Sequence, residues 1–338
     1  MKTGILLINL GTPDSPSTGD VRKYLRQFLN DPRVIDISPL GRLLLVNLVI
    51  VPFRAPKSAK LYKSIWTEKG SPLLIHGIAL KEKLQETLGG NYVVVFGMRY
   101  QNPSLGSALE ELRKAGVSKI KIVPLYPQYA SSSTGSTLEE LMRLVRKWEV
   151  IPSLESISHF YDHPAFIRAL TAAGKEFDHR QYDHVVFSYH GLPERQIKKA
   201  AVHYGNDSCS FGTCCDKITE NNRYCYRANC FQTSRLLSEA LGIPKEKYTI
   251  SFQSRLGKTP WIKPYSDHVI EERAKKGDKK LLVFSPAFVA DCLETVHEIG
   301  VEYNELFRKH GGEKVQLVPS LNSRQEWVQA LQEILEVK

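Results

Sequence analysis

The stretch VVFSYHGLPER, residues 185–195, contains the pattern on which the whole chain is built. It begins with apolar residues typical of a buried β-strand and ends in a Gly-Leu-Pro turn, with His190 where the strand gives way to the turn. The end of a strand holds a side chain rigidly, as catalysis and metal binding require, although an ordinary core histidine is the alternative. Because imidazole accepts protons near neutral pH and ligates divalent transition metals, His190 is the first candidate functional residue.

The same pattern of an apolar run ending in Gly, Pro or polar residues recurs along the chain. It occupies residues 5–10, 92–96, 119–125, 248–252, 281–284 and 314–318. Short apolar strands that alternate with helical segments predict parallel sheets covered on both faces. We therefore expect an α/β fold of two similar doubly wound lobes with a cleft between them, in which ligands bind at the carboxyl ends of the strands.

The domain boundary is expected near Ile151-Pro152-Ser153 or shortly after it. We place an N-terminal lobe at residues 1–158 and a C-terminal lobe at 159–320, with a cysteine-rich insertion at 203–230. The last helical segment, 321–338, is expected to cross back and pack on the first lobe.

Composition narrows the function classes. The 338 residues are 42% hydrophobic and 24% charged, with a formal net charge of +10, which describes an ordinary globular protein with a basic excess. Lys and Arg are scattered, with no basic helix carrying interleaved aromatics, so we expect no nucleic-acid partner. The first apolar run resembles a β-strand more than a signal peptide, which predicts a cytoplasmic protein whose cysteines are thiols or metal ligands.

Two common phosphate-binding motifs are missing. No GxGxxG follows the first strand, and no GxxxxGK(S/T) occurs in the chain. A dinucleotide-dependent dehydrogenase and a P-loop NTPase are therefore not expected.

Three glutamates, Glu294, Glu298 and Glu302, recur at intervals of four residues just after the apolar run 281–284. On a helix this spacing forms one acidic stripe, which is often only a solvated face. Because the helix would begin at the carboxyl end of a strand, we favour a functional stripe that passes a divalent cation or protons.

Two further features would suit a flat, amphiphilic ligand. Trp261 lies in a proline-rich loop, where it is either a rigid wall for a planar ring or a cover for the core. The apolar run 43–53 is too short for a helix that crosses about 30 Å of hydrocarbon, and Arg54 follows it directly. We expect either a core segment or an exposed apolar lip, and a lip would favour peripheral contact with a membrane.

The cysteines are clustered. Five of the six lie within 22 residues, namely Cys209, Cys214, Cys215, Cys225 and Cys230. Thiolates hold zinc or iron–sulfur clusters, and the spacing alone leaves both open because the CxxC pair of structural zinc sites is missing. Cys292 lies apart and is expected to be a small buried side chain.

Six motifs in order resemble those of the ferrochelatases, the enzymes that insert ferrous iron into a porphyrin. They are LLINLGTPDS, FGMRYQNPS, PLYPQYASSSTGS, FSYHGLPER, QSRLGKTPW and DCLETVHEIGVEY, and together they cover nearly the whole chain. The resemblance implies two lobes with a cleft between them. It also implies that Fe²⁺ and protoporphyrin IX or coproporphyrin III are the substrates. A cobalt-inserting chelatase that acts on a sirohydrochlorin-type ring is the alternative.

The resemblance also implies roles for particular residues. His190 and Glu294 would be the facing pair that handles the metal and the pyrrole protons, and we expect them to meet from opposite lobes. Glu298 and Glu302 would continue the carboxylate row as a relay, on a helix with a π-type widening. The positions that line or close the porphyrin pocket would be Leu10, Arg54, Arg99, Tyr126 and Trp261.

The cysteine-rich segment resembles that of bacterial ferrochelatases that carry a 2Fe–2S cluster. By this resemblance the cluster ligands would be Cys209, Cys215, Cys225 and Cys230, with Cys214 as the alternative to Cys215. Zinc remains the rival metal. The sequence does not predict an oligomeric state.

Overall fold

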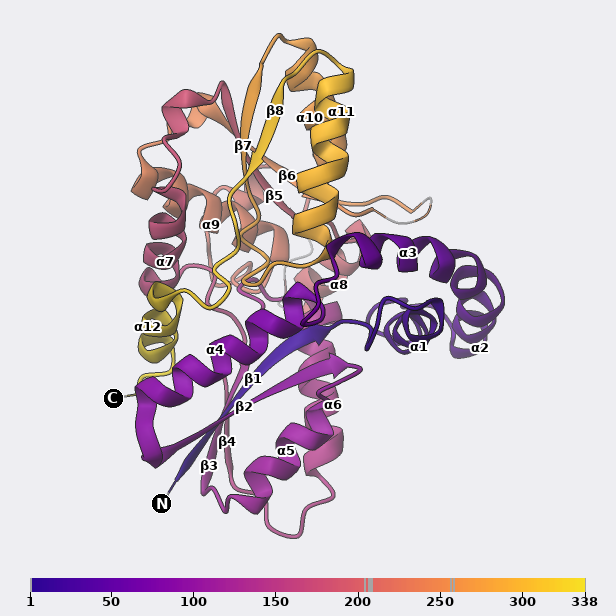
Figure 1. Cartoon of the computed structure of the whole chain (residues 1–338), viewed down its shortest axis with the longest axis vertical. Helices are drawn as coiled ribbons and strands as arrows, with labels where there is room; N and C mark the ends of the chain where they lie inside the picture. Colours follow the sequence, from indigo (N-terminus) through magenta and orange to yellow (C-terminus); the bar gives the residue numbers. More distant parts are fainter. Residues whose placement is uncertain (1, 204, 206–208, 256, 258, 338) are drawn as a thin grey trace. The chain divides into compact units, whose positions relative to one another are not determined.

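The structure is a computed structural model that describes residues 2–203, 205, 209–255, 257 and 259–337 (Figure 1). The chain divides into two compact units. Unit 1 comprises Met1–Tyr126, Ser131–His159 and Leu335–Lys338, and unit 2 comprises Pro127–Ala130 and Phe160–Ile334. The main division falls between His159 and Phe160, one residue after the boundary placed from the sequence.

Unit 1 is built on a parallel sheet with the strand order β2-β1-β3-β4. Its strands are β1 (Thr3–Gly11), β2 (Tyr92–Tyr100), β3 (Lys119–Pro124) and β4 (Ser153–Ser156). Its helices are α1 (Thr18–Leu29), α2 (Pro39–Leu44), η1 (Leu45–Ile50), α3 (Val51–Ile65), α4 (Pro72–Leu88), η2 (Gly89–Asn91), α5 (Leu105–Lys114), η3 (Ser131–Gly135) and α6 (Ser136–Val145), of which η1 and η3 are π-helices.

Unit 2 repeats this order with β6-β5-β7-β8, again parallel. Its strands are β5 (His184–His190), β6 (Tyr248–Gln253), β7 (Lys280–Phe284) and β8 (Lys314–Leu317). Its helices are α7 (Pro164–Gly174), η4 (His179–Gln181), α8 (Glu194–His203), η5 (Thr213–Cys215), α9 (Tyr226–Leu241), η6 (Lys245–Lys247), α10 (Ser266–Lys275), η7 (Leu293–Tyr303), α11 (Asn304–Lys309) and α12 (Gln325–Ile334). These two sheets with their flanking helices confirm the predicted α/β class.

Strand β4 was not predicted, and its sequence explains why. It has only four residues, Ser-Leu-Glu-Ser, and lies at the edge of its sheet, partly exposed. An edge strand of this kind lacks the apolar run that marks the buried strands.

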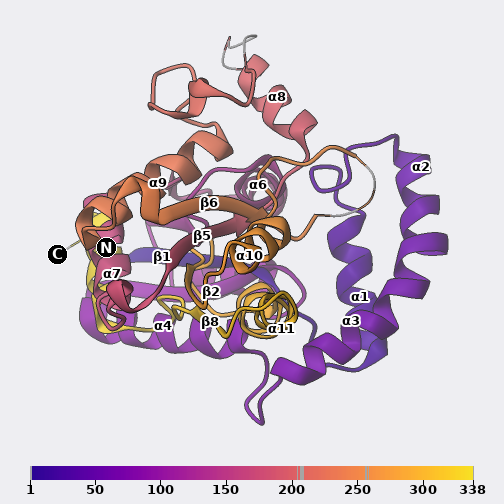
Figure 2. The same ribbon diagram turned by 90° about the horizontal axis from the view of Figure 1, so that it is seen from above.

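The core of unit 2 follows the alternation of side chains along β5. Val186 packs with Ile270 of α10 and Phe307 of α11, whereas the ring of Phe187 packs against Phe284 and Tyr248. Figure 2 shows α10 and α11 together on one side of this sheet, with α7 and α9 on the other. Covering both faces explains why β5 is apolar at every position from Val185 to Phe187.

The last helix differs from expectation. Helix α12 packs against α7 and belongs to unit 2, and only the final residues from Leu335 onward belong to unit 1. The reason is an aromatic cluster in which the fully buried Trp327 packs on Phe160 and Phe166. A buried Trp contributes so much apolar contact that it fixes where its helix packs.

The apolar run 43–53 is part of a much longer helical stretch than the sequence indicated. Helices α2, η1 and α3 follow one another without a break over residues 39–65, and only 17% of the most apolar window is buried. Leu48 is 66% exposed and Phe53 is 73% exposed, so the segment is an exposed lip rather than core. By length and composition alone, these 27 residues could cross a membrane.

Candidate active site

His190 is the last residue of β5, where it is half-buried. Its Nδ1 lies 2.7 Å from the carbonyl oxygen of Gly191. Because a carbonyl can only accept, Nδ1 carries the proton in this contact, and in the neutral imidazole the lone pair is therefore on Nε2. The imidazole is thus oriented by its own backbone, with Nε2 as the nitrogen that can accept a proton.

The turn after His190 is shaped by a close approach of the backbone to β6. A Cβ atom at Gly191 would lie 2.8 Å from the Gln253 carbonyl oxygen and 3.3 Å from the indole ring of Trp261. The segment continues as an antiparallel bridge between Pro193 and Trp261, closed by a hydrogen bond from the Ile262 N–H to the Leu192 carbonyl. Glycine is therefore required beside His190, and the Trp261 indole lies next to Gly191 within unit 2.

Glu294, Glu298 and Glu302 lie on the π-helix η7, which runs directly into α11 (Figure 1). The widening implied by the resemblance is present. The N-terminus of η7 is fixed by Thr295, whose hydroxyl accepts from the Cys292 N–H and donates to Asp291. Cys292 itself is buried, as predicted. π-helical turns are rare and often mark functional sites.

Glu298 is the best anchored of the three carboxylates. It accepts hydrogen bonds from the Ser254 N–H at 3.0 Å, the Ser254 hydroxyl at 2.5 Å, the Gln253 amide at 3.1 Å and the Tyr303 hydroxyl at 3.1 Å. Ser254 adopts a left-handed backbone with φ of 64°, which costs a non-glycine residue about 1 kcal/mol or more. Gln253, Ser254 and Tyr303 were not predicted as site residues, although the first two lie in the QSRLGKTPW motif and Tyr303 ends the DCLETVHEIGVEY motif. Leu256 and Lys258 of that motif lie outside the described residues.

His190, Glu294 and Glu298 form one electrostatic group. Burial raises the pKa of Glu298; among its charged neighbours, Glu294 raises that pKa and His190 lowers it. Gln253 pairs with His190 across β5 and β6, and its amide also donates to the Glu294 carbonyl at 2.9 Å. The expectation that His190 and Glu294 come from opposite lobes is wrong, because both belong to unit 2 and are joined through β6.

Glu302 differs from the other two. Its side chain is 51% exposed and lies 3.4 Å from the imidazole of His297. The row therefore runs from the half-buried Glu294 and Glu298 to a glutamate in contact with solvent.

Unit 1 carries the remaining predicted residues. Leu10 and Arg99 lie near the carboxyl ends of β1 and β2, and Tyr126 follows β3. Burial raises the pKa of the Tyr126 phenol, and the charge of Arg99 lowers it. Arg54 lies on α3 and is exposed.

A buried network that sequence analysis missed holds Arg99. Its guanidinium donates to the Asp31 carboxylate at 2.7 Å and to the Ser136 hydroxyl at 2.8 Å, and it lies over the Tyr100 ring. The same Asp31 oxygen accepts from the Tyr100 hydroxyl at 2.9 Å and from Ser136 at 2.5 Å. A buried carboxylate that satisfies an arginine in this way fixes its direction.

The clustered cysteines are all free thiols and lie in unit 2. The sulfur atoms of Cys214 and Cys215 are 4.0 Å apart, and Cys215 is hydrogen-bonded to Cys225 and accepts from the Arg227 guanidinium at 2.9 Å. Within the residues that the structure describes, no set of three or more His, Cys, Asp or Glu is arranged to hold a metal ion. Residues 204 and 206–208 of the predicted insertion lie outside the described residues.

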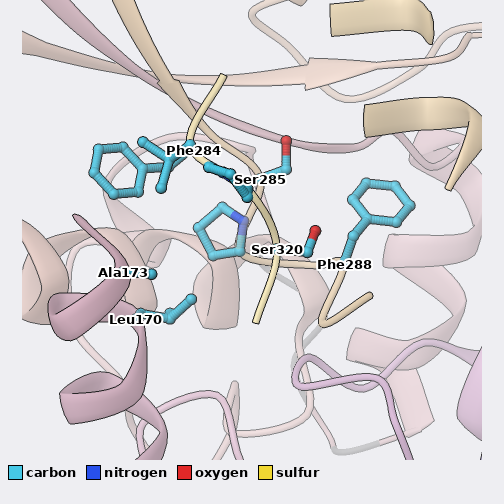
Figure 3. A pocket seen from close by; sticks show the side chains of 9 residues that line it. Leu170, Ala173, Phe284, Ser285, Phe288 and Ser320 are labelled. Atoms are coloured by element: carbon cyan, nitrogen blue, oxygen red, sulfur yellow. The ribbon is translucent and has the colours of Figure 1, made fainter. Parts of the chain in front are cut away.

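A pocket lies at the carboxyl ends of β7 and β8 and is lined by Phe284, Ser285, Phe288 and Ser320, among others (Figure 3). Its cavity volume of about 10 Å³ is close to that needed for a single water molecule and lies far below the roughly 300–1,000 Å³ of typical ligand pockets. We do not assign it to a porphyrin. Phe288 connects it with the centre described above, because its ring lies 6.4 Å from the His190 imidazole.

Comparison with known proteins identifies the family. The family model described as Ferrochelatase matches residues 2–338. The ferrochelatase of Legionella pneumophila (strain Lens) is 48% identical over 335 residues, which cover 99% of both chains. The ferrochelatase of Coxiella burnetii (strain Dugway 5J108-111) is 45% identical over 98% of this chain and 92% of its own. The chain belongs to the ferrochelatase family.

As a member of the ferrochelatases, the protein is an enzyme that inserts ferrous iron into a porphyrin in haem biosynthesis. Among solved structures, SirB from Bacillus subtilis with Fe³⁺ has a TM-score of 0.56 and 14% identity, covering 99% of this chain and 94% of its own. At that identity the likeness shows the shared fold alone. The ferrochelatase assignment is therefore favoured over the sirohydrochlorin-type alternative.

Proposed function

We propose that His190, Glu294 and Glu298 form the centre at which the porphyrin loses its pyrrole protons and receives ferrous iron. The observation that carries this proposal is the position of Gln253. It pairs with His190 across the sheet, and its amide reaches both the Glu294 carbonyl and the Glu298 carboxylate. One residue thus joins the strand end that carries His190 to the acidic helix.

The proton balance assigns the roles. Insertion replaces two pyrrole N–H protons by Fe²⁺, so two bases must each take one proton. His190 Nε2, which keeps its lone pair, takes one, and the Glu294 carboxylate takes the other. Glu298, whose pKa burial raises, accepts protons in turn, and the exposed Glu302 passes them to solvent.

Binding of the ring is assigned to the aromatic and cationic residues. Trp261, whose indole lies beside Gly191, provides a rigid aromatic face, and binding energy used to bend the macrocycle lowers the barrier to insertion. In unit 1, Arg54 and Arg99 provide cations for the propionates, and Leu10 and Tyr126 line the ring. Protoporphyrin IX and coproporphyrin III differ in the number of these carboxylates, so insertion rates with both porphyrins identify the substrate.

The experiment that tests this centre is the variant His190→Ala. General-base catalysis is worth about 10²- to 10⁴-fold, so we expect kcat to fall by at least a hundredfold. Porphyrin affinity, measured by fluorescence quenching in the absence of iron, should stay within about threefold of the native value, which is less than 1 kcal/mol. A variant that inserts iron at the native rate would remove His190 from the reaction.

We also propose that the cysteine segment holds a 2Fe–2S cluster. The thiols of Cys209, Cys214, Cys215 and Cys225 form a chain of contacts. The contact with Cys225 and burial raise the pKa of Cys215, whereas the contact with Cys215 lowers the pKa of Cys225 and favours a thiolate at Cys225. Cys230 is hydrogen-bonded to the Tyr226 hydroxyl and is fully buried. These contacts favour Cys214 over Cys230 as the fourth ligand. When bound, the cluster would cross-link the cysteine segment. No step of iron insertion is assigned to the cluster.

Metal content tests the cluster. Protein purified under anaerobic conditions should be brown and contain iron and acid-labile sulfide at two atoms each per chain, as the cluster type requires. Cys214→Ser should lose the visible absorbance, whereas Cys230→Ser should keep it. Stoichiometric zinc without sulfide would decide for the rival metal.

We propose that the enzyme is cytoplasmic and that the exposed apolar lip at residues 43–53 contacts a membrane surface. Leu43, Leu48 and Phe53 are all exposed there, and the basic net charge favours an anionic bilayer. In sedimentation with phosphatidylglycerol vesicles, the double variant Leu48→Glu/Phe53→Glu should lose binding. Met142→Glu, at another exposed apolar residue on α6, should keep it.

A further inference from the structure

Helix α9 is attached to the end of β5 by two tyrosine hydroxyls. Tyr226, the first residue of α9, donates to the His190 carbonyl oxygen at 2.8 Å. Tyr189, the residue before His190, lies 2.8 Å from the Ser234 hydroxyl of the same helix. Both phenol rings are buried, so water cannot readily replace these bonds.

The same end of α9 is held by the cysteine segment. Cys225 is the N-cap residue of the helix and is hydrogen-bonded to Cys215. Cys215 also receives the Arg227 guanidinium on its sulfur, at 2.9 Å, and the Arg235 guanidinium on its carbonyl oxygen, at 3.2 Å. A change at the Cys215 sulfur therefore acts on the turn that carries Tyr226.

We propose that Tyr226 is a positioning residue for His190. Through Tyr226, a change in the contacts of the Cys215 sulfur would alter the rate of iron insertion. The proposal rests on the assignment of His190 as the reacting base. It gives the cysteine segment a role in the reaction through the backbone of His190.

The geometry explains why one hydroxyl matters. His190 ends its strand, and its ring is oriented by the carbonyl of Gly191. Tyr226 holds the carbonyl of the peptide bond that joins His190 to Gly191, so the position of the Gly191 carbonyl relative to the imidazole depends on that hydrogen bond. A displacement of about 1 Å in a reacting group can reduce a rate by about a hundredfold. A hydrogen bond to the backbone at this point is thus sufficient to govern catalysis without contact with the substrate.

The variant Tyr226→Phe tests the positioning role. We expect kcat to fall by about tenfold, with KM for the porphyrin within about twofold, because only the orientation of the base changes. Hydrogen–deuterium exchange of the peptide 185–195 should accelerate in the same variant. Tyr248→Phe is the matched control, since this tyrosine packs on Phe187 at the other end of β5 and should change neither readout.

A double-mutant cycle tests the coupling. Cys215→Ala should lower kcat and accelerate exchange in the peptide 185–195 in the native background, and both effects should disappear when Phe replaces Tyr226. Additive effects on kcat and exchange would overturn the coupling. Arg227→Lys, which keeps the charge but loses the planar donor to Cys215, should reproduce the effect of Cys215→Ala. If peptide 185–195 of Arg227→Lys exchanges at the native rate, the proposal is overturned, even where Tyr226→Phe does not fold.

The outcomes separate this inference from the assignment on which it rests. If His190→Ala is inactive while Tyr226→Phe matches the native enzyme, the coupling is wrong and the reaction centre stands. If His190→Ala retains native activity, the assignment of the base is wrong.

Discussion

The two units share one architecture and differ in the chemistry at the carboxyl edge of the sheet. Both have the strand order second-first-third-fourth, and in both a π-helix follows the third strand. In unit 1 that π-helix is η3, with the sequence SSSTG, and the nearby strand β2 carries Arg99. In unit 2 it is η7, which carries the three glutamates.

This difference shows that one fold can place different side chains at the carboxyl edge of its sheet. The few side chains at that edge determine the chemistry of each unit. Unit 1 pairs the cation of Arg99 with the buried Asp31. Unit 2 gathers His190, Glu294 and Glu298 around Gln253. We interpret unit 1 as the part that anchors the porphyrin and unit 2 as the part that performs the insertion, and each prediction below tests that division.

The largest effect should come from Glu298→Gln in unit 2. Removing the proton acceptor should lower kcat by about a hundredfold, with KM for the porphyrin nearly unchanged. A steady-state comparison of kcat and KM measures this. A variant that raises KM alone would place porphyrin binding, rather than chemistry, in unit 2.

The same variant should also change how the free energy of unfolding depends on pH. Burial raises the pKa of Glu298, so its neutral form is more favoured in the folded than in the unfolded protein. The stability that this group contributes is therefore lost as pH rises through the folded pKa. The free energy of unfolding of Glu298→Gln, relative to the native enzyme, should therefore increase with pH from about 4.5 upward. Urea titrations at several pH values measure the difference, and a flat difference would contradict it.

Asp31→Asn in unit 1 should give the opposite kinetic pattern. The uncharged amide no longer holds the Arg99 guanidinium, so KM for the porphyrin should rise by about tenfold while kcat stays within about threefold, a change of roughly 1.4 kcal/mol in binding. The measurement is the same steady-state comparison. A loss confined to kcat would break the division between the units.

Two substitutions of Ser254 should distinguish the effect of its hydroxyl on catalysis from the effect of its left-handed backbone on stability. Ser254→Ala and Ser254→Gly both remove the hydrogen bond to Glu298, so each should lower kcat by about fivefold, the effect of one hydrogen bond of about 1 kcal/mol. Glycine also relieves the left-handed backbone and should be more stable than alanine by about 1 kcal/mol. Equal thermal stability of the two variants would show that the backbone carries no strain.

The smallest effect on activity should come from His184, at the other end of β5 from His190. Burial lowers the pKa of His184 to about 4, so the folded state resists protonation and loses stability as pH falls from about 6.5 to 4. His184→Gln, which can still bond to Thr249, should leave kcat unchanged and flatten this acid limb. Unfolding curves between pH 4 and 7 measure the pH dependence of stability in both proteins. A change in kcat would show that a substitution at the first residue of β5 reaches His190 at its last residue.

The sequence predicted the strands and the candidate residues because these depend on local patterns. A buried parallel strand is an apolar run, and His190 stands where such a run meets a turn. Gln253, Ser254 and Asp31 were missed because their importance comes from partners more than 40 residues away in the chain. Helix α12 was misplaced for the same reason, since the partners of Trp327 come from α7 and the segment before it.

By itself, the sequence determined the α/β class, the family and the chemical types of the site residues, because apolar periodicity and short motifs are written in consecutive residues. The tertiary structure alone decided that His190 and Glu294 belong to one unit, that Gln253 joins them, and that α9 links the cysteine segment to β5. The physical reason is that a buried hydrogen bond or aromatic contact depends on where the sheet register brings two distant segments, and no local pattern records that register.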